Sequence, residues 1–397
     1  MNPKLEINDA DFLKNSIKIM NELNNNNTFL FYFNHDPDAI GSSLALALFL
    51  QHQKKESIIY LPGGTESTLD FILDIVEYNH IIIEKDINKA EEILRNKKPV
   101  IITTDTATHL LLPNFDIINK LIIEEKLITI EIDHHFGGDS ENVYNDSITL
   151  FKNTNSTCEI IAEFLEFIGK EENENLDNDI IFPRNIVLSL LVGICFDTQL
   201  GKFVNNKKVY NKWFDFLSER LEWLTWGSPK IIRSAMQVFE AINKISRNKR
   251  KIISDIVKNT KIINKVGLLM IPPYEKYQSL DKNGDPTCIL AKIIPDLANK
   301  VPEYSGTIGI TAFFDTVLLT YFIKVRRSYK FKKYDLRNCE TSLKNLFGDK
   351  YLGGGGHEGA TSFRVSEMDR SDFIKKIKLF HNNLAKIVEE VLFNTTS

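Results

Sequence analysis

Short apolar runs alternate with helical stretches through the first half of this 397-residue chain. We expect strands at 28–33, 57–61, 100–104 and 127–132. The alternation predicts an α/β domain built on a doubly wound, mainly parallel sheet with helices on both faces. Because ligands of such open sheets bind beyond the carboxyl ends of the strands, the residues that follow each run are the first candidates for a functional site.

The second half of the chain has a different pattern. Residues 205–261 show helical periodicity and are rich in Lys, Arg, Trp and Phe, which indicates a helical linker or insertion. Beyond them we expect a strand at 261–271, a helix at 288–301, two strands at 306–313 and 317–325, a glycine cluster and a terminal helix. Since a chain of this length usually forms two cores, we expect an N-terminal domain at 1–204 and a smaller C-terminal α/β domain at 262–397.

The composition, 43% hydrophobic and 26% charged, is that of an ordinary globular protein. The net charge of -4 argues against coating long nucleic acid by bulk electrostatics. Apolar runs fall far short of the ~20 residues of a membrane span, and the polar start does not resemble a signal peptide. We therefore expect a cytoplasmic protein. The four cysteines show no CxxC spacing, so neither a disulfide framework nor a structural zinc site is expected.

Two carboxylates lie close together directly after the first expected strand. Asp36 and Asp38 belong to the stretch 35–42, His-Asp-Pro-Asp-Ala-Ile-Gly-Ser, which precedes an expected helix at about 42–52. Such crowding is costly unless a cation compensates it, and hard oxygen ligands suit Mn²⁺ or Mg²⁺. The alternative is that one of these carboxylates merely caps the helix.

A triplet, Asp133-His134-His135, is the most specific candidate and follows the expected strand 127–132. Neutral imidazole is a good ligand for Mn, Fe or Zn, and an adjacent Asp can bind the metal or orient a histidine. The alternative is a pair of solvated loop histidines.

Two further carboxylates follow apolar runs. Asp105 comes directly after the expected strand 100–104, and Asp197 follows the run 186–194. Each, taken alone, is as well explained as a turn or cap residue. Residues 156–159, Ser-Thr-Cys-Glu, predict a helix start in which a hydroxyl caps backbone amides.

The C-terminal half carries two candidates for phosphate binding. Glycines 353–356 precede His357, and successive glycines let backbone N–H groups approach an anion. Residues 324–328, Lys-Val-Arg-Arg-Ser, include guanidinium groups that can clamp a phosphate. An ordinary glycine loop and a solvated basic strand end are the alternatives.

Together, and in this order, these elements resemble the DHH phosphoesterase family with its C-terminal DHH-associated domain. The namesake triplet is 133–135, the D-x-D-A-I-G-S element is 36–42, and the Gly-Gly-Gly-His signature is 354–357. The resemblance covers nearly the whole chain. It implies a catalytic domain with two Mn²⁺ per chain, for which Mg²⁺ or Co²⁺ can substitute. It also implies a smaller substrate domain, with the active site between the two.

The resemblance also implies a role for each residue. Asp105 would bridge both metals, Asp36 would hold one, and Asp38, His134 and Asp197 would complete the other. His135 would face the substrate phosphate. The substrate-binding residues implied in the second domain are Arg327, Ser328, Gly354, Gly355, Gly356 and His357.

The chain departs from the family at the first motif. Relatives usually place a metal-binding His four residues before the first Asp, or an Asp two residues before it, and here those positions hold Tyr32 and Asn34. Either the adjacent His35 replaces the missing ligand, or the first metal is weakly held. Gln199 stands where a Gly is common after the fourth Asp.

The expected function is hydrolysis of short oligonucleotides, 3′-phosphorylated nucleotides or cyclic dinucleotides by a metal-activated water. The alternatives are an inorganic pyrophosphatase or polyphosphatase, and a nucleotide-binding regulator with an impaired metal site. The expected partner is a small nucleotide or short oligonucleotide. Neither a membrane nor a long duplex is expected, and a homodimer is compatible with the sequence.

Overall fold

The computed structural model describes residues 4–62, 69–136, 140–172, 178–227, 231–244, 247–271, 278–280, 286–315 and 318–393. The chain divides into two compact units, residues 1–244 and 245–397. The division falls inside the stretch 205–261, so the helices of that stretch belong to different units. In the part of the chain described, no helix combines the length and the apolar character needed to cross a bilayer.

The first unit is built on a six-stranded, wholly parallel sheet with the order β3-β2-β1-β4-β5-β6. Its strands are β1 (Thr28–Tyr32), β2 (Glu56–Tyr60), β3 (Ile82–Glu84), β4 (Val100–Thr104), β5 (Thr129–Asp133) and β6 (Ile148–Phe151). The four strands expected from the sequence are present. The sequence pattern missed β3 and β6, which are short.

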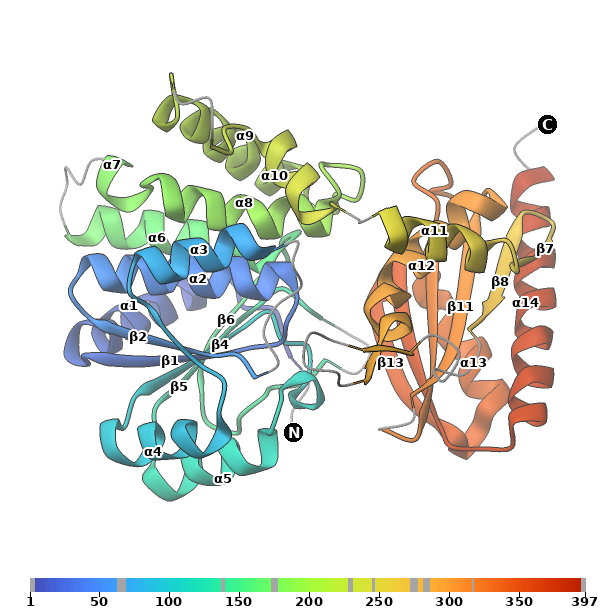
Figure 1. The fold of residues 1–397 in the computed structure, drawn as a ribbon, viewed down its shortest axis with the longest axis horizontal. Coiled ribbons are helices and arrows are strands. Elements are labelled where there is room, and N and C mark those ends of the chain that lie inside the picture. Colours follow the sequence, from blue (N-terminus) through green and yellow to red (C-terminus); the bar gives the residue numbers. More distant parts are fainter. Residues whose placement is uncertain are drawn as a thin grey trace. The chain divides into compact units, whose positions relative to one another are not determined.

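Helices cover both faces of this sheet (Figure 1). The helices of the first unit are α1 (Asp9–Asn25), α2 (Pro37–His52), α3 (Asp70–Tyr78), α4 (Ile87–Lys97), α5 (Phe115–Glu125), α6 (Thr157–Glu172), α7 (Asn178–Ile181), α8 (Arg184–Thr198), α9 (Lys207–Leu224) and α10 (Ala235–Ile242). Helices α9 and α10 pack on α8. Phe29 and Phe31 of β1 pack in the core formed with α2, α6 and α8. Leu30 and Tyr32 pack on the opposite face with α4 and α5. Strands buried on both faces need continuous apolar runs, which is why their sequence pattern was visible. The predicted doubly wound α/β fold is confirmed.

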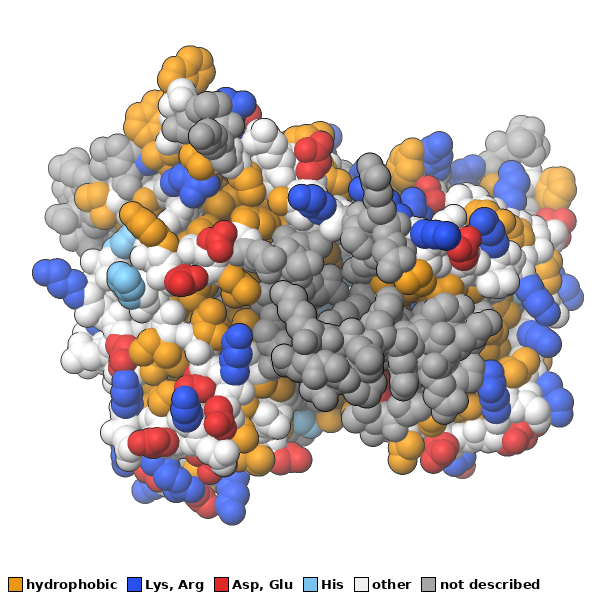
Figure 2. Space-filling model, viewed as in Figure 1, with side chains coloured by type: hydrophobic (Ala, Val, Ile, Leu, Met, Phe, Trp, Pro, Cys, Tyr) orange, Lys and Arg blue, Asp and Glu red, His pale blue; other side chains and the backbone are white. Residues whose placement is uncertain are grey.

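The solvent-facing side of the first unit carries mixed charge. Figure 2 shows acidic and basic side chains interspersed on its visible face rather than gathered by sign. On the outer side of α4, for example, Arg95 lies 3.4 Å from Glu125 and 3.6 Å from Glu124, N to O.

The second unit contains another six-stranded sheet, with the order β13-β14-β12-β11-β8-β7. Its strands are β7 (Lys261–Ile263), β8 (Val266–Met270), β11 (Ile308–Asp315), β12 (Thr320–Arg327), β13 (Tyr351–His357) and β14 (Ala360–Ser366). Its helices are α11 (Arg247–Val257), α12 (Ile289–Ser305), α13 (Cys339–Phe347) and α14 (Arg370–Phe393). Strands β9 (Gln278–Leu280) and β10 (Pro286–Cys288) pair with each other in a separate two-stranded ribbon. Neighbours are antiparallel except β8 and β11, which are parallel.

Two expectations for this unit were wrong. The single strand expected at 261–271 is a hairpin of β7 and β8, because Asn264 and Lys265 adopt left-handed backbone angles with φ of 46° and 65°. The glycine cluster is not a loop but belongs to strand β13. Gly354 pairs so closely with β14 that an added Cβ would lie 2.4 Å from the carbonyl oxygen of Ser362. The glycine is required there by strand packing.

Candidate metal centre

The first carboxylate pair is held at the start of α2. Asp36 caps the helix, its Oδ1 accepting the N–H of Asp38 at 2.9 Å. Asn34 orients this turn, because its Oδ1 accepts the N–H of Asp36 at 2.9 Å while its Nδ2 donates to the carbonyl oxygen of Asp105 at 3.0 Å. Asp36 therefore caps α2 through its Oδ1, and Asn34, which stands at a family ligand position, holds backbone groups in place.

Asp38 is fully buried against the start of α6. Its Oδ2 accepts the N–H of Thr157 at 2.6 Å, and its Oδ1 accepts the N–H of Cys158 at 3.1 Å. The first amides of a helix favour a negative charge. The predicted helix start at 156–159 is present, and the Ser156 hydroxyl accepts the N–H of Glu159 at 3.3 Å. Sequence reasoning treated this segment as a cap alone and missed that its amides hold a site carboxylate.

Asp105 projects from the end of β4 with a left-handed backbone, φ 50°. Such a conformation is uncommon outside glycine and often marks a functional position. Its Oδ1 accepts the hydroxyl hydrogen of Thr157 at 3.0 Å and lies 3.3 Å from Nε2 of His134. Burial acts to raise the pKa of Asp105, but the hydrogen bond from His134 and the charges of both histidines lower it overall.

His134 lies among three carboxylates. Its Nε2 is 3.3 Å from Oδ1 of Asp105, 3.4 Å from Oδ2 of Asp197 and 3.9 Å from Oδ2 of Asp38. One ligand atom from each of these four residues lies within 4.8 Å of the others. Asp197 is supplied by the last turn of α8, a buried helix rather than a strand. The sequence therefore identified all four members of this group, here called the four-residue cluster.

The electrostatics of the four-residue cluster favour a cation. Burial and the charge of Asp105 raise the pKa of Asp38 well above the usual carboxyl range. Burial and the charges of Asp38 and Asp105 do the same to the pKa of Asp197. Burial and Asp105 likewise raise the pKa of Asp36 to about 7. Carboxylates gathered in a buried space repel one another, and a divalent cation removes this repulsion.

Both carboxylate oxygens of Asp133 already have hydrogen-bond partners within the protein. The buried ammonium of Lys4 pairs with its Oδ2 and also donates to the carbonyl oxygen of Thr106. Its Oδ1 accepts the N–H of His134 at 2.8 Å and the Nδ1–H of His135 at 2.8 Å. Because both oxygens are engaged, Asp133 orients the two histidines. Sequence reasoning could not find Lys4, which lies 129 positions away.

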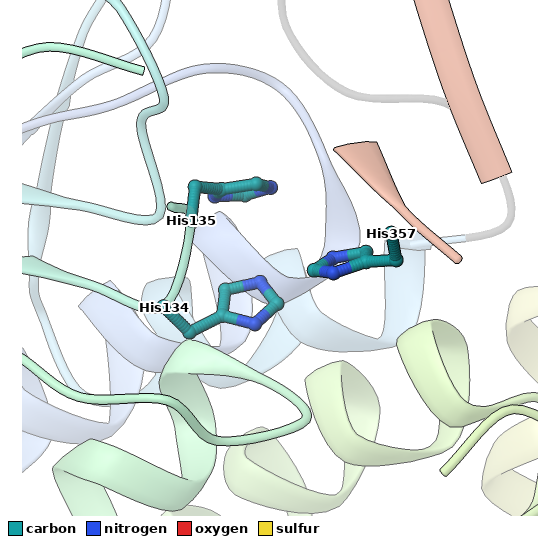
Figure 3. Close-up of side chains that lie close together, drawn as sticks. All are labelled: His134, His135 and His357. Atoms are coloured by element: carbon teal, nitrogen blue, oxygen red, sulfur yellow. The ribbon is translucent and has the colours of Figure 1, made fainter. Parts of the chain in front are cut away.

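His135 is the more accessible imidazole of the pair, with 29% of its side chain exposed, whereas His134 is 1% exposed. Figure 3 shows both rings projecting from the segment after β5, and their centroids are 4.4 Å apart. Burial acts to lower the pKa of His135, but Asp133 and Asp105 raise it to about 9. This shift favours the protonated ring, with Nδ1–H directed to Asp133.

His35 lies outside both groups of metal-ligating atoms that the described residues of the first unit form. Its side chain is exposed overall, and the only influence on its pKa is partial desolvation of the ring, which lowers it; no carboxylate contributes. Tyr32 points to the other face of the sheet, where its hydroxyl donates to the carbonyl oxygen of Pro113 at 2.7 Å. Gln199 ends α8 with φ 48°, a conformation that explains why a glycine suits this position.

The predicted substrate residues of the second unit have structural partners. Arg327, 5% exposed, pairs with Glu358 and donates to the carbonyl oxygen of Tyr334 at 3.0 Å. Ser328 is buried, and its N–H donates to the carbonyl oxygen of Thr307 at 2.6 Å. Gly354, Gly355, Gly356 and His357 lie along β13. The guanidinium of Arg327 is thus largely committed within the fold.

The fold of the first unit and its four-residue cluster resemble those of the DHH phosphoesterases. Residues 29–194, within the first unit, match the model of the N-terminal domain of the DHH family. Members of this family are metal-dependent phosphoesterases. An uncharacterized protein of Methanocaldococcus jannaschii is 31% identical over 180 residues, which are 45% of this chain and 47% of that protein. The chain thus spans about half the length of this curated relative.

Two solved structures share the fold over most of the chain. An exopolyphosphatase-related protein from Bacteroides fragilis has a TM-score of 0.65 and 16% identity, covering 95% of this chain and 98% of that one. A DHH domain described as belonging to a member of a family of ribosomal proteins has a TM-score of 0.52 and 14% identity, covering 95% of this chain and 91% of that one. At such identities the likeness shows the fold alone.

Proposed function

We propose that this protein is a metal-dependent phosphoesterase that hydrolyses short oligonucleotides, 3′-phosphorylated nucleotides or cyclic dinucleotides. The observation that carries the proposal is the four-residue cluster: three carboxylates and one imidazole, almost wholly buried, with ligand atoms within 4.8 Å of one another. Mixed carboxylate and imidazole ligands suit Mn²⁺, and Mg²⁺ or Co²⁺ are expected substitutes.

The ligand set follows from the same contacts. Asp38, His134 and Asp197 would hold one ion, and Asp105 would be shared. Asp36 is not a member of the four-residue cluster, but the charge of Asp105 raises its pKa, and the resemblance to the DHH family implies that it would hold a second ion. When bound, the ions supply positive charge to the reacting phosphate and lower the pKa of water toward neutrality. His35 is exposed and no carboxylate contributes to its pKa, so we leave it out of the set.

The chain's own residues supply orientation and a proton. Asp133, neutralised by Lys4, accepts the Nδ1–H of His135 and thereby fixes the ring. The ring of His135, which is partly exposed beside the four-residue cluster, would then face the substrate phosphate. Helix α6 keeps Asp38 and Asp105 in position through Thr157 and Cys158. Preorganised groups of this kind contribute to catalysis because they need no rearrangement as charge develops.

A second candidate is hydrolysis of inorganic pyrophosphate or polyphosphate. It is favoured by the likeness in fold to a protein described as exopolyphosphatase-related. A nucleotide-binding regulator, the remaining alternative, would bind nucleotide without turnover even with Mn²⁺ in excess.

The test is a substrate screen with the full-length protein. The linear dinucleotide pApA, cyclic di-AMP, pAp and pyrophosphate are each incubated with Mn²⁺ or with EDTA, and released phosphate and nucleotide are measured. We expect Mn²⁺-dependent turnover of a nucleotide substrate that Asp38→Asn reduces at least a hundredfold, while Asp86→Asn, a cap on the distant helix α4, leaves the rate unchanged. Turnover that persists in EDTA, or in Asp38→Asn, would contradict the proposal.

A further inference from the structure

The members of the four-residue cluster come from four separate elements. Asp38 lies at the start of α2, Asp105 after β4, His134 after β5 and Asp197 in the last turn of α8. A metal site assembled from separate elements depends on the contacts behind its ligands, since these contacts orient the ligands and tune metal affinity. The groups that join the four elements to one another therefore bear directly on metal binding.

One short segment, residues 153–159, contacts three of the four members. Its backbone amides bind Asp38, and one of its hydroxyl groups donates to Asp105. The carbonyl oxygen of Thr154 lies 3.4 Å from Nδ1 of His134. A hydrogen on Nδ1 directed at this carbonyl leaves the lone pair of Nε2 facing the carboxylates, as a metal ligand requires.

Asn155 connects this segment to the loop that follows the fourth member. Its Oδ1 accepts the N–H groups of Asn205 and Asn206, both at 2.8 Å, and its Nδ2 donates to the carbonyl oxygen of Asn206 at 3.0 Å. Asn206 caps α9, and the loop that ends there begins directly after the helical turn that carries Asp197. Three hydrogen bonds of one side chain thus tie the loop after Asp197 to the segment that holds the other members.

Glu159 holds Asn155 in turn. Its Oε2 accepts the backbone N–H of Asn155 at 2.7 Å, and both of its carboxylate oxygens accept Nδ2–H of Asn155 at 3.0 Å. A glutamate three residues after an N-cap serine commonly reaches back to a backbone N–H before the helix, which accounts for the first bond. It does not account for the bonds to the side chain. Glu159 is fully buried, so it is available to orient Asn155 rather than to bind solvent.

We propose that Asn155 is a positioning residue of the metal centre and that Glu159 supports it. Through the loop at 205–206, Asn155 sets the position of Asp197 relative to the members held by residues 153–159. The ligand atoms then lie within 4.8 Å of one another before an ion binds, so little rearrangement opposes binding. The inference rests on the proposed function, because it takes the four-residue cluster to hold a metal ion.

The test exchanges the polarity of the pair. In Asn155→Asp a second carboxylate faces Glu159, so the two side chains repel each other. In the double variant Asn155→Asp/Glu159→Gln the carboxylate and the amide have changed places. The carboxylate can accept the same N–H groups of the loop, the amide can donate to it, and the net charge is that of the wild type. Isothermal titration calorimetry with MnCl₂ as the probe measures the Mn²⁺ affinity of the full-length, metal-free protein, and urea unfolding in EDTA measures its stability.

Asn155→Asp should weaken Mn²⁺ binding by about 10–100-fold, the usual effect of losing a group behind a metal ligand, and the double variant should recover most of this loss. A purely structural role would instead lower the stability in EDTA and leave Mn²⁺ affinity unchanged. The control is Asn15→Asp, the same substitution at an asparagine whose Nδ2 joins α1 to β6 by donating to the carbonyl oxygen of Thr149 at 2.9 Å. This control should leave Mn²⁺ affinity unchanged.

The outcomes are separable. Wild-type Mn²⁺ affinity in Asn155→Asp, an equal loss in the single and double variants, or the same loss in Asn15→Asp would overturn the proposal. If Asn155→Asp does not fold, Asn155→Ala decides in its place, because it removes the bonds to the loop without adding a charge: weakened Mn²⁺ binding supports the proposal and wild-type affinity overturns it. A wild type that binds Mn²⁺ but hydrolyses none of the screened substrates would refute the proposed function alone, whereas a wild type that binds no Mn²⁺ would overturn both.

Discussion

Lys4 should stabilise the turn that carries both site histidines. Its ammonium is buried, pairs with Asp133, donates to the carbonyl oxygen of Thr106 and lies 5.1 Å from the centre of the Phe151 ring. The side chains of Lys4 and Asp133 are only 1% and 2% exposed. Removing one member of a buried pair leaves an uncompensated charge, which costs about 3–5 kcal/mol. Lys4→Met keeps the length of the side chain and removes only the charge, so its unfolding free energy should fall by about that amount.

The assay is urea denaturation at pH 7, with Lys97→Met as the control. Lys97 pairs with Glu56 at side-chain exposures of 41% and 35%, so its loss should cost about 0–1 kcal/mol. The loss of unfolding free energy in Lys4→Met, relative to the wild type, should depend on pH. Burial acts to raise the pKa of Asp133, but Lys4 and His135 lower it overall. A depressed carboxyl pKa stabilises the fold above the unfolded value of ~3.9 and ceases to do so as the pH falls toward the folded value.

The deficit should therefore be largest near neutral pH and shrink as acid protonates Asp133 in the variant. Two results would refute this reasoning: a deficit below about 1 kcal/mol at pH 7, or one that stays constant from pH 7 down to pH 4. Either would mean that Asp133 does not depend on Lys4 for its charge, and the interpretation of Asp133 as an orienting group would lose its support.

Three further predictions concern single positions. His35→Ala should leave Mn²⁺ stoichiometry unchanged in equilibrium dialysis, because His35 is exposed and outside the ligand groups, and loss of one ion would restore it as a ligand. Arg327→Met should lower the unfolding free energy by about 1–3 kcal/mol, because the carbonyl oxygen of Tyr334 loses its donor. Unchanged stability together with a raised KM would instead indicate that Arg327 contacts the substrate. Gly193→Ala should weaken Mn²⁺ binding roughly 10–100-fold, because its Cβ would lie 2.0 Å from Oδ1 of Asp38, and an unchanged affinity would contradict this placement.

The fold of the first unit was predictable where strands are buried on both faces. The run that became β1 sends Phe29 and Phe31 into one core and Leu30 and Tyr32 into the other, so every position is apolar. The edge strands β3 and β6 were missed because each is short and offers too few consecutive apolar positions to be recognised. The hairpin of β7 and β8 was missed because Asn264 and Lys265 adopt positive φ without a glycine to signal the turn.

The four-residue cluster was predictable because its members follow apolar runs in a recognisable order. What the sequence could not show is which groups hold them. Lys4 and Thr157 reach the site only through the fold, and no local pattern connects either residue to Asp133 or Asp105. The faces of the sheet on which Arg326 and Arg327 lie could not be read from the sequence either, because a shift of one residue in strand register moves a side chain to the opposite face.

The account's central claim is that the four-residue cluster is a metal centre with Asp105 shared between two ions. Equilibrium dialysis of the full-length protein against Mn²⁺, followed by elemental analysis, tests it most directly. The account predicts about two Mn²⁺ per chain for the wild type and a clear loss of bound metal in Asp105→Asn, with unchanged circular dichroism. A wild type that binds no Mn²⁺, or an Asp105→Asn variant with the wild-type binding curve, would contradict it.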